Sequence, residues 1–332
     1  MTTQALARTI AIMVGFIATW LLGKWVIPML QRFKAGQSIR QDGPTWHNSK
    51  SGTPTMGGIM FILGGGIACI CAHFAMTTTG DYTHFYIFIF ALVFGIIGFI
   101  DDYFKVKKKQ NLGLHAREKF VLQLAAAVGF IALMRYEGLV SNTLVVPFVG
   151  ISFTLPWVAY MVFAAFVIVG TVNAVNITDG VDGLAATVTY VVMMMFALIG
   201  TYLSIGGVEV FGAAFFAALM GFLFYNRYPA KVFMGDTGSL FLGGAVAALA
   251  FAIDRPLLLI PMGIIYIVET LSVILQVGYF KATHGKRLFK MAPIHHHFEM
   301  CGWKETKVVT VFFFITLLGC ILAVYDVIMS VY

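Results

Sequence analysis

The sequence predicts an all-α polytopic membrane protein with about ten transmembrane helices. Of its 332 residues, 60% are hydrophobic and only 11% are charged, whereas soluble domains are about half apolar and about a quarter charged. The apolar segments have helical length, because roughly 20 residues at ~1.5 Å each cross a hydrocarbon core of ~30 Å. Barrel strands would instead alternate over about 10 residues. We therefore expect a single integral membrane domain over residues 1–332.

Ten spans are expected in chain order, and the first is expected to be retained, because no small-residue cleavage site followed by a soluble domain is visible. Between the fourth and fifth spans, segment 141–156 is too short and too alternating to cross a bilayer. It predicts a small external β-hairpin on the membrane surface. The expected spans are about 6–30, 56–76, 84–100, 119–134, 157–175, 184–204, 208–225, 238–253, 257–280 and 308–331.

Lysine and arginine are distributed unevenly between the connecting segments. Loops 31–55, 101–119, 226–237 and 281–307 carry 18 of the 22 basic residues, and the alternate segments carry three. By the positive-inside rule these four loops are cytoplasmic and both termini are external. The same bias accounts for the net charge of +7, so no nucleic-acid partner is expected. The four cysteines form no CxxC motif, and free thiols are expected.

Five carboxylates lie in short polar interruptions beside the apolar segments. Charge near a bilayer is costly, at ~2.5–3.5 kcal/mol in the centre and less at the edge. All five, with a run of three histidines, lie in loops on the cytoplasmic side; the loop of Asp179 and Asp182 has no basic residue and is placed there by the alternation of the spans. This shared side predicts a cytoplasmic active-site cleft assembled from several loops. The residues are Asp101, Asp102, Asp179, Asp182, Asp236, His295, His296 and His297.

The adjacent acids Asp101 and Asp102 open the loop after the third span, in the string IDDYFK. One interpretation is a polar stop at the membrane interface, with the following KVKKK as counter-charge. The other is a Mg²⁺ and phosphate site, because Mg²⁺ binds one or two carboxylates together with phosphate oxygens and water. The motif alone leaves both interpretations open.

The string NITDGVDG places Asn176, Asp179 and Asp182 three residues apart, in a loop with no lysine or arginine. A cation or a sugar–base ligand would account for these uncompensated acids. Asp236 precedes Thr237, Gly238 and Ser239, one turn before the eighth span. Such a sequence is typical of a helix N-cap and is also compatible with phosphate binding, so this motif alone does not assign Asp236.

The histidine triplet lies in the internal string PIHHHFE. Three consecutive residues rarely converge on one ion, and no cysteine supports zinc. Contacts to phosphate are therefore preferred for these rings. In the ninth span, Glu269 and Gln276 share a helical face. Gln276, nearer the cytoplasmic end, is the better ligand candidate.

These strings together resemble the polyprenyl-phosphate N-acetylhexosamine-1-phosphate transferase superfamily. Within it, APIHHHFE is similar to the phospho-N-acetylmuramoyl-pentapeptide transferase family rather than to the enzymes that transfer simple amino-sugars. The resemblance covers nearly the whole chain. Its motifs are KSGTPTMGGIM at 50–60, DDYFK at 101–105, GLHAREKFVLQ at 113–123, NAVNITDGVDGLA at 173–185, YNRYPAKVFMGDTGSL at 225–240 and KMAPIHHHFEMCGWKE at 290–305.

The resemblance implies transfer of phospho-MurNAc-pentapeptide from UDP-MurNAc-pentapeptide to undecaprenyl phosphate, giving UMP and lipid I in the bacterial inner membrane. It also implies Mg²⁺, membrane lipid as surroundings and, commonly, a homodimer. Asp101, Asp102 and Asp236 would handle the metal or the lipid phosphate, and His296 would join them as a catalytic residue. Asp101 is the first choice for contact with the attacking phosphate.

The resemblance further implies a set of substrate contacts, in which we favour Lys119 over Arg117. Direct attack by the lipid phosphate and a covalent phospho-Asp intermediate both stay open. A related N-acetylhexosamine-1-phosphate transferase, an ion-coupled transporter and a structural membrane scaffold are the alternatives. The expected substrate contacts are Lys50, Thr55, Lys119, Asn176, Asp179, Asp182, Asn226, Phe233, Gln276, Ala292, His295 and His297.

Overall fold

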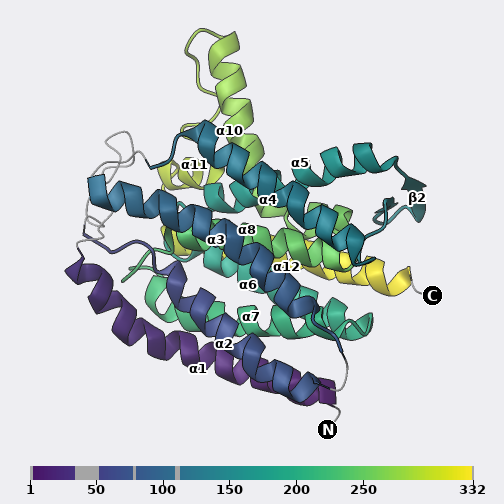
Figure 1. The fold of residues 1–332 in the computed structure, drawn as a ribbon. Coiled ribbons are helices and arrows are strands. Elements are labelled where there is room, and N and C mark those ends of the chain that lie inside the picture. Colours follow the sequence, from purple (N-terminus) through teal and green to yellow (C-terminus); the bar gives the residue numbers. More distant parts are fainter. Residues whose placement is uncertain (1–2, 34–51, 78–79, 109–112, 331–332) are drawn as a thin grey trace.

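The computed structural model describes residues 3–33, 52–77, 80–108, 113–330. Among these residues, ten helices are long and apolar enough to cross a membrane, as the sequence predicts, and most run side by side in one bundle (Figure 1). They are α1 (Thr3–Arg32), α2 (Gly58–Met76), α3 (Thr83–Lys108), α4 (Ala116–Tyr136), α5 (Trp157–Thr178), α6 (Leu184–Tyr202), α7 (Gly206–Asn226), α8 (Gly235–Ala252), α10 (Ile264–Ala282) and α12 (Glu305–Met329).

The predicted hairpin is confirmed as a two-stranded antiparallel sheet, and its external side stays a prediction. Strand β1 (Thr143–Val146) pairs with β2 (Ile151–Thr154) in a register that places Thr143 opposite Thr154. Both strands are only four residues long, and a hairpin of this size needs support from neighbouring elements. One support is the backbone N–H of Phe148, which donates to the Asp326 carboxylate of α12 at 2.6 Å.

Two predicted boundaries near the acids are wrong. Helix α3 continues past residue 100 to Lys108, so Asp101 and Asp102 lie inside a helix rather than in a loop. Residues 101–108 contain no glycine or proline, and three lysines in the last turn favour a helix C-terminus. Helix α8 begins at Gly235, so Asp236 lies in its first turn rather than before it.

The ninth predicted span is not continuous. Residues 256–282 form a 3₁₀ turn η2 (Pro256–Leu258), a short helix α9 (Leu259–Met262) and then α10. Prolines at 256 and 261 lack the N–H groups of a continuous helix, and Gly263 separates α9 from α10. Helix α10 then projects beyond the other helices, at the top of Figure 1. The seven-residue helix α11 (Ile294–Met300) carries the histidine triplet.

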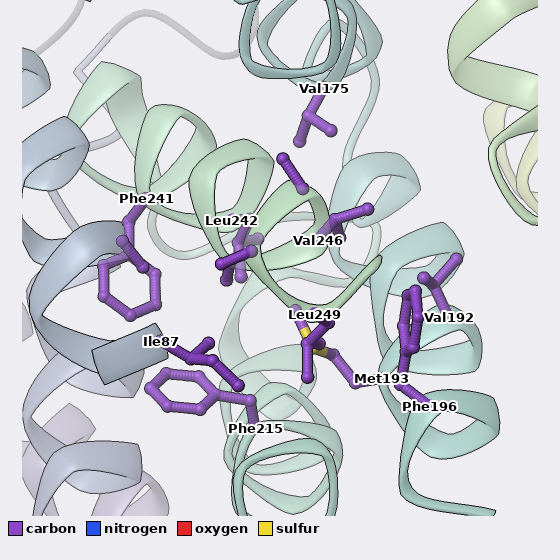
Figure 2. Packing of buried hydrophobic residues seen from close by; sticks show 14 of the residues in the cluster. Ile87, Val175, Val192, Met193, Phe196, Phe215, Phe241, Leu242, Val246 and Leu249 are labelled. Carbon is purple, nitrogen blue, oxygen red and sulfur yellow. The ribbon is translucent and has the colours of Figure 1, made fainter. Parts of the chain in front are cut away.

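Helix α8 lies at the centre of the bundle, and almost all of its side chains are buried. Figure 2 shows its residues Leu242, Val246 and Leu249 surrounded by side chains of α3, α5, α6 and α7. Its glycines allow close approach: a Cβ on Gly243 would lie 2.5 Å from the Cα of Val172 in α5. Small residues commonly permit such contacts between membrane helices. The first turn of α8, with Asp236, is therefore held by a rigid support.

Candidate active site

Asp101, Asp102 and Asp236 come together at one end of the bundle. One carboxylate oxygen from each residue lies within 4.8 Å of the other two. The approach depends on Gly98 of α3, where a Cβ would overlap the backbone carbonyl of Asp236. Only glycine lets α3 and α8 touch through their backbones here. We call these three carboxylates the acid cluster.

Asp102 caps helix α8 from the neighbouring helix. Its Oδ1 accepts a hydrogen bond from the Asp236 N–H at 3.2 Å, and its Oδ2 accepts from the Thr237 N–H at 2.9 Å and the Thr237 hydroxyl at 2.7 Å. The first N–H groups of a helix have no partner within it. The cap of α8 is therefore supplied by Asp102, and Asp236 remains available for other contacts.

Two lysines lie close enough to the acid cluster to form ion pairs with it. Lys105 Nζ lies 2.6 Å from Asp101 Oδ2 and 3.0 Å from Asp236 Oδ2. Lys119 Nζ, from α4, lies 2.6 Å from Asp236 Oδ2 and 4.0 Å from Asp101 Oδ2. Arg117 is exposed, so Lys119 is the basic residue of this segment that reaches the acids.

Asn176 connects the acid cluster to α5. Its amide Nδ2 donates to Asp236 Oδ1 at 2.9 Å and to the Ser239 hydroxyl at 2.7 Å. With Lys119 on Oδ2 and Asn176 on Oδ1, both oxygens of Asp236 are oriented. Contacts from α3, α4 and α5 therefore orient the Asp236 carboxylate.

The 179–183 loop, which joins α5 to α6, holds its two acids differently. Asp182 is buried and its Oδ2 accepts from the Ala230 N–H at 2.9 Å, while its own N–H donates to Glu305 Oε2 at 3.3 Å. Asp179 lies just beyond α5. Burial, followed by repulsion from Asp236, Asp102 and Asp182, raises the pKa of the Asp179 carboxyl to about 8.

Thr55 and Phe233 lie on two paired segments beside the acid cluster. The Phe233 N–H donates to the Pro54 carbonyl at 2.8 Å, and the Gly57 N–H donates to the Phe233 carbonyl at 2.8 Å. Thr55 is buried next to Gly235, whose φ of +69° requires a left-handed backbone. A Cβ on Gly235 would lie 2.5 Å from Asp102 Oδ2 and 2.7 Å from the Thr55 hydroxyl. The pairing therefore brings the two segments to the acids.

Asn226 is buried and donates through Nδ2 to the Val232 carbonyl at 2.9 Å. This bond closes the turn between α7 and α8. Gln276 has a similar backbone contact, because its Oε1 accepts from the N–H groups of Leu288 and Phe289 at 3.1 and 2.9 Å. Both amides hold chain segments in place, and their predicted contacts with substrate stay predictions.

The three histidines do not share one environment. His295 is fully buried, with Nδ1 2.9 Å from Glu269 Oε2. His296 Nδ1 lies 2.7 Å from Glu299 Oε2, and His297 Nδ1 accepts from the Lys290 N–H at 3.1 Å. Each ring therefore has its own partner. Full burial separates His295 from its two neighbours as a structural support.

Several known proteins are similar to this chain over most of its length. The family model for Glycosyl transferase family 4 matches residues 84–254, and the Phospho-N-acetylmuramoyl-pentapeptide-transferase signature 1 matches residues 50–62. A phospho-N-acetylmuramoyl-pentapeptide-transferase of Clostridium botulinum (strain Eklund 17B / Type B) is 47% identical over 94% of each chain. The protein of the same name from Caldanaerobacter subterraneus is 46% identical over 95% of this chain and 97% of its own length. The one from Listeria monocytogenes is 45% identical over 95% of this chain and 96% of its own length.

The chain belongs to the phospho-N-acetylmuramoyl-pentapeptide-transferase family. The resemblance predicted from the sequence motifs is thereby confirmed, and the ten apolar helices make the chain a multi-pass bacterial membrane protein. The matched family model includes all five acids, whereas the histidine triplet lies beyond it. The signature begins at Lys50, which lies outside the described residues, and it includes Thr55.

Sequence reasoning on this phospho-N-acetylmuramoyl-pentapeptide-transferase family member missed two residues of the site. Lys105 stands four residues after Asp101, a spacing that pairs opposite charges on a helix, and the expected helix end at residue 100 hid this signal. The sequence favours Gln276 over Glu269 as a ligand, yet it is Glu269 that lies against a histidine. Ala292 is half-buried before Pro293, and its role stays a prediction.

Proposed function

We propose that this chain transfers phospho-MurNAc-pentapeptide from UDP-MurNAc-pentapeptide to undecaprenyl phosphate, producing UMP and lipid I. The observation that carries the proposal is the acid cluster with Lys105 and Lys119, packed at the ends of apolar helices. Two phosphorylated substrates meet in this reaction, and one of them keeps its chain in lipid. The names of the curated relatives support the same activity.

The proposal includes an orientation in the membrane. Lysine and arginine are concentrated in the loops that the alternation of spans puts on the side of the acids, which supports a cytoplasmic active site and external termini. UDP-linked substrates are cytoplasmic, so this orientation gives the site access to them. A homodimer stays a prediction.

The acid cluster fits a hard divalent cation. Its donor atoms are all carboxylate oxygens, the ligands that Mg²⁺ prefers, and Mg²⁺ commonly uses one or two of them together with substrate phosphates. Asp101 and Asp236 would hold the ion, with Asp102 beside them. When bound, Mg²⁺ supplies neutralisation of charge on the diphosphate.

The reaction forms a bond between a phosphate oxygen of undecaprenyl phosphate and the phosphorus attached to the sugar. The bond from that phosphorus to the oxygen bridging to UMP breaks, and the electron pair leaves with UMP. Phosphoryl transfer depends mainly on positioning and on neutralising charge. Lys105 and Lys119 stand beside the acids to do this. The lipid phosphate has a second pKa near ~6 and is mostly dianionic at neutral pH, so no protein base is required.

The test is UMP release by the purified full chain in detergent with UDP-MurNAc-pentapeptide, undecaprenyl phosphate and Mg²⁺. We expect stoichiometric UMP and a lipid-linked sugar product, both dependent on the lipid phosphate. UDP-N-acetylglucosamine in place of the pentapeptide substrate is the control for the related amino-sugar transferases. UMP release only with that control substrate, or ion uptake into vesicles without UMP release, would contradict the proposal.

A further inference from the structure

We propose that Glu269 is a positioning residue, which fixes His295 and through it the backbone that carries Asp179. The proposal rests on the proposed function for its kinetic assay only. Glu269 belongs to α10, His295 to α11 and Asp179 to the 179–183 loop. Three separate parts of the chain therefore meet in one buried support.

The first contact is between Glu269 and His295. The Glu269 side chain is 0% exposed and the His295 side chain 1% exposed, and Oε2 lies 2.9 Å from Nδ1. In the described part of the chain, neither Glu269 oxygen and neither His295 nitrogen has a hydrogen bond, so the 2.9 Å approach is an ion-pair contact between two otherwise unpartnered buried groups. An unpaired buried carboxylate is expensive, so the imidazole is its compensating partner. Because Nδ1 lies against the carboxylate in a fully buried site, the contact restricts where the ring can lie.

The second contact is between His295 and Gly180. A Cβ built on Gly180 would overlap His295 Nε2 and lie 2.7 Å from Cε1. The ring therefore presses directly on the backbone of the 179–183 loop, at a position where no side chain fits. Since interiors are close-packed, a rotated or displaced ring would move this backbone.

The other half of the 179–183 loop has a separate anchor. Asp182 is fixed by the Ala230 N–H and through its own N–H by Glu305. This anchor lies three residues after Asp179. At Gly180, the adjoining residue, the support is the His295 ring. Loss of that support frees the half of the loop that presents Asp179 toward the acid cluster.

This geometry also changes the role of His295. The sequence resemblance made it a substrate contact, yet its ring is enclosed between Glu269 and Gly180. We infer that it acts through Asp179 rather than on phosphate or sugar directly. The buried Glu269–His295 pair serves to position the His295 ring, in the way that buried polar contacts in other proteins fix structural register.

The kinetic experiment compares Glu269→Gln, Glu269→Asp and Thr270→Val. Thr270 is the next residue of α10 and serves as the matched control. We expect Glu269→Gln to raise KM for UDP-MurNAc-pentapeptide by about tenfold, with kcat and KM for undecaprenyl phosphate within about twofold. Glu269→Asp should recover part of the loss, and Thr270→Val should behave like the wild type. Wild-type kinetics in Glu269→Gln, or an equal loss in every parameter and in Tm, would overturn the proposal.

A second experiment needs no turnover and separates this proposal from the proposed function. Gly180→Ala and His295→Ala are made singly and together, and Tm is measured for each. We expect Gly180→Ala to lower Tm in the wild-type background and to have little effect when His295 is absent, because the overlapping ring is gone. Additive changes in Tm would overturn the proposed contact chain. Absence of UMP release by the wild type would contradict the proposed function, and the Tm comparison could still be interpreted.

Discussion

The acid cluster and the 179–183 loop lie at the same end of the bundle but balance their negative charge in different ways. In the acid cluster, Lys105 and Lys119 lie within ion-pair distance of Asp101 and Asp236. The loop contains no lysine or arginine, and there the pKa of Asp179 is raised to about 8. The chain thus neutralises one region itself and leaves the other to a proton or a ligand. This difference suggests that the cluster handles metal and phosphate and that the loop handles the nucleotide-sugar.

The largest expected effect comes from removing the negative charge of Asp236, which pairs with both Lys105 and Lys119. Asp236→Asn should lower kcat for UMP release by at least ~10²-fold, because it uncouples Lys105, Lys119 and Asn176. Asp254→Asn, just beyond the other end of α8, is the control and should stay within about twofold. Near-wild-type turnover in Asp236→Asn would remove this residue from the reaction.

The next effect separates the two acids of the loop. Asp179→Asn should lower activity by roughly tenfold or more without lowering Tm, since a neutral amide replaces a carboxyl that already holds a proton at neutral pH but that can no longer ionise when a ligand binds. Asp182→Ala should instead lower Tm, because the Ala230 N–H loses its acceptor and an unsatisfied buried group costs about 1–3 kcal/mol. Melting curves and UMP release on both variants make the measurement. Equal changes in UMP release and in Tm for the two variants would contradict the different roles of Asp179 and Asp182.

A further expected effect, on stability alone, is a pH dependence. The folded pKa of Asp179 is about 8, above its unfolded value of ~3.9. The folded state therefore keeps a proton that the unfolded state loses, and stability falls as pH rises between about 4 and 8. Wild-type Tm should decline over this range relative to Asp179→Asn. Adding Mg²⁺ should weaken the decline, because a cation at the acid cluster offsets the repulsion from Asp236 and Asp102. Parallel Tm curves for the two proteins would contradict this origin.

The span count and the hairpin were predictable because hydropathy and alternation are local properties. The helix ends near the acids were not, because hydropathy changes at residue 100 while α3 continues to Lys108. Helical propensity and the lysines of the last turn decide that end. The break at Gly263 was missed for a related reason: an apolar stretch hides a change of direction.

The gathering of the three cluster acids was also predictable, since the basic residues placed their loops on one side. The different structural roles of these acids were not predictable from the sequence. Asp102 caps α8 only because Gly98 lets the two helix backbones touch. Likewise, His295 is a buried support because Glu269 and Gly180 close over it. Such roles depend on neighbours distant in the sequence, and no local pattern records them.

The lysine pairs of the acid cluster have a consequence for how the protein handles chelators. Lys105 and Lys119 act as built-in counter-ions, so the site can assemble before any divalent cation arrives. Small metal domains behave in the opposite way, because binding of the ion is what folds them. Treatment with EDTA should therefore stop turnover while leaving Tm nearly unchanged, and added Mg²⁺ should restore turnover at once. The ion would then be an exchangeable part of a permanent site, supplied with the substrate rather than built into the fold.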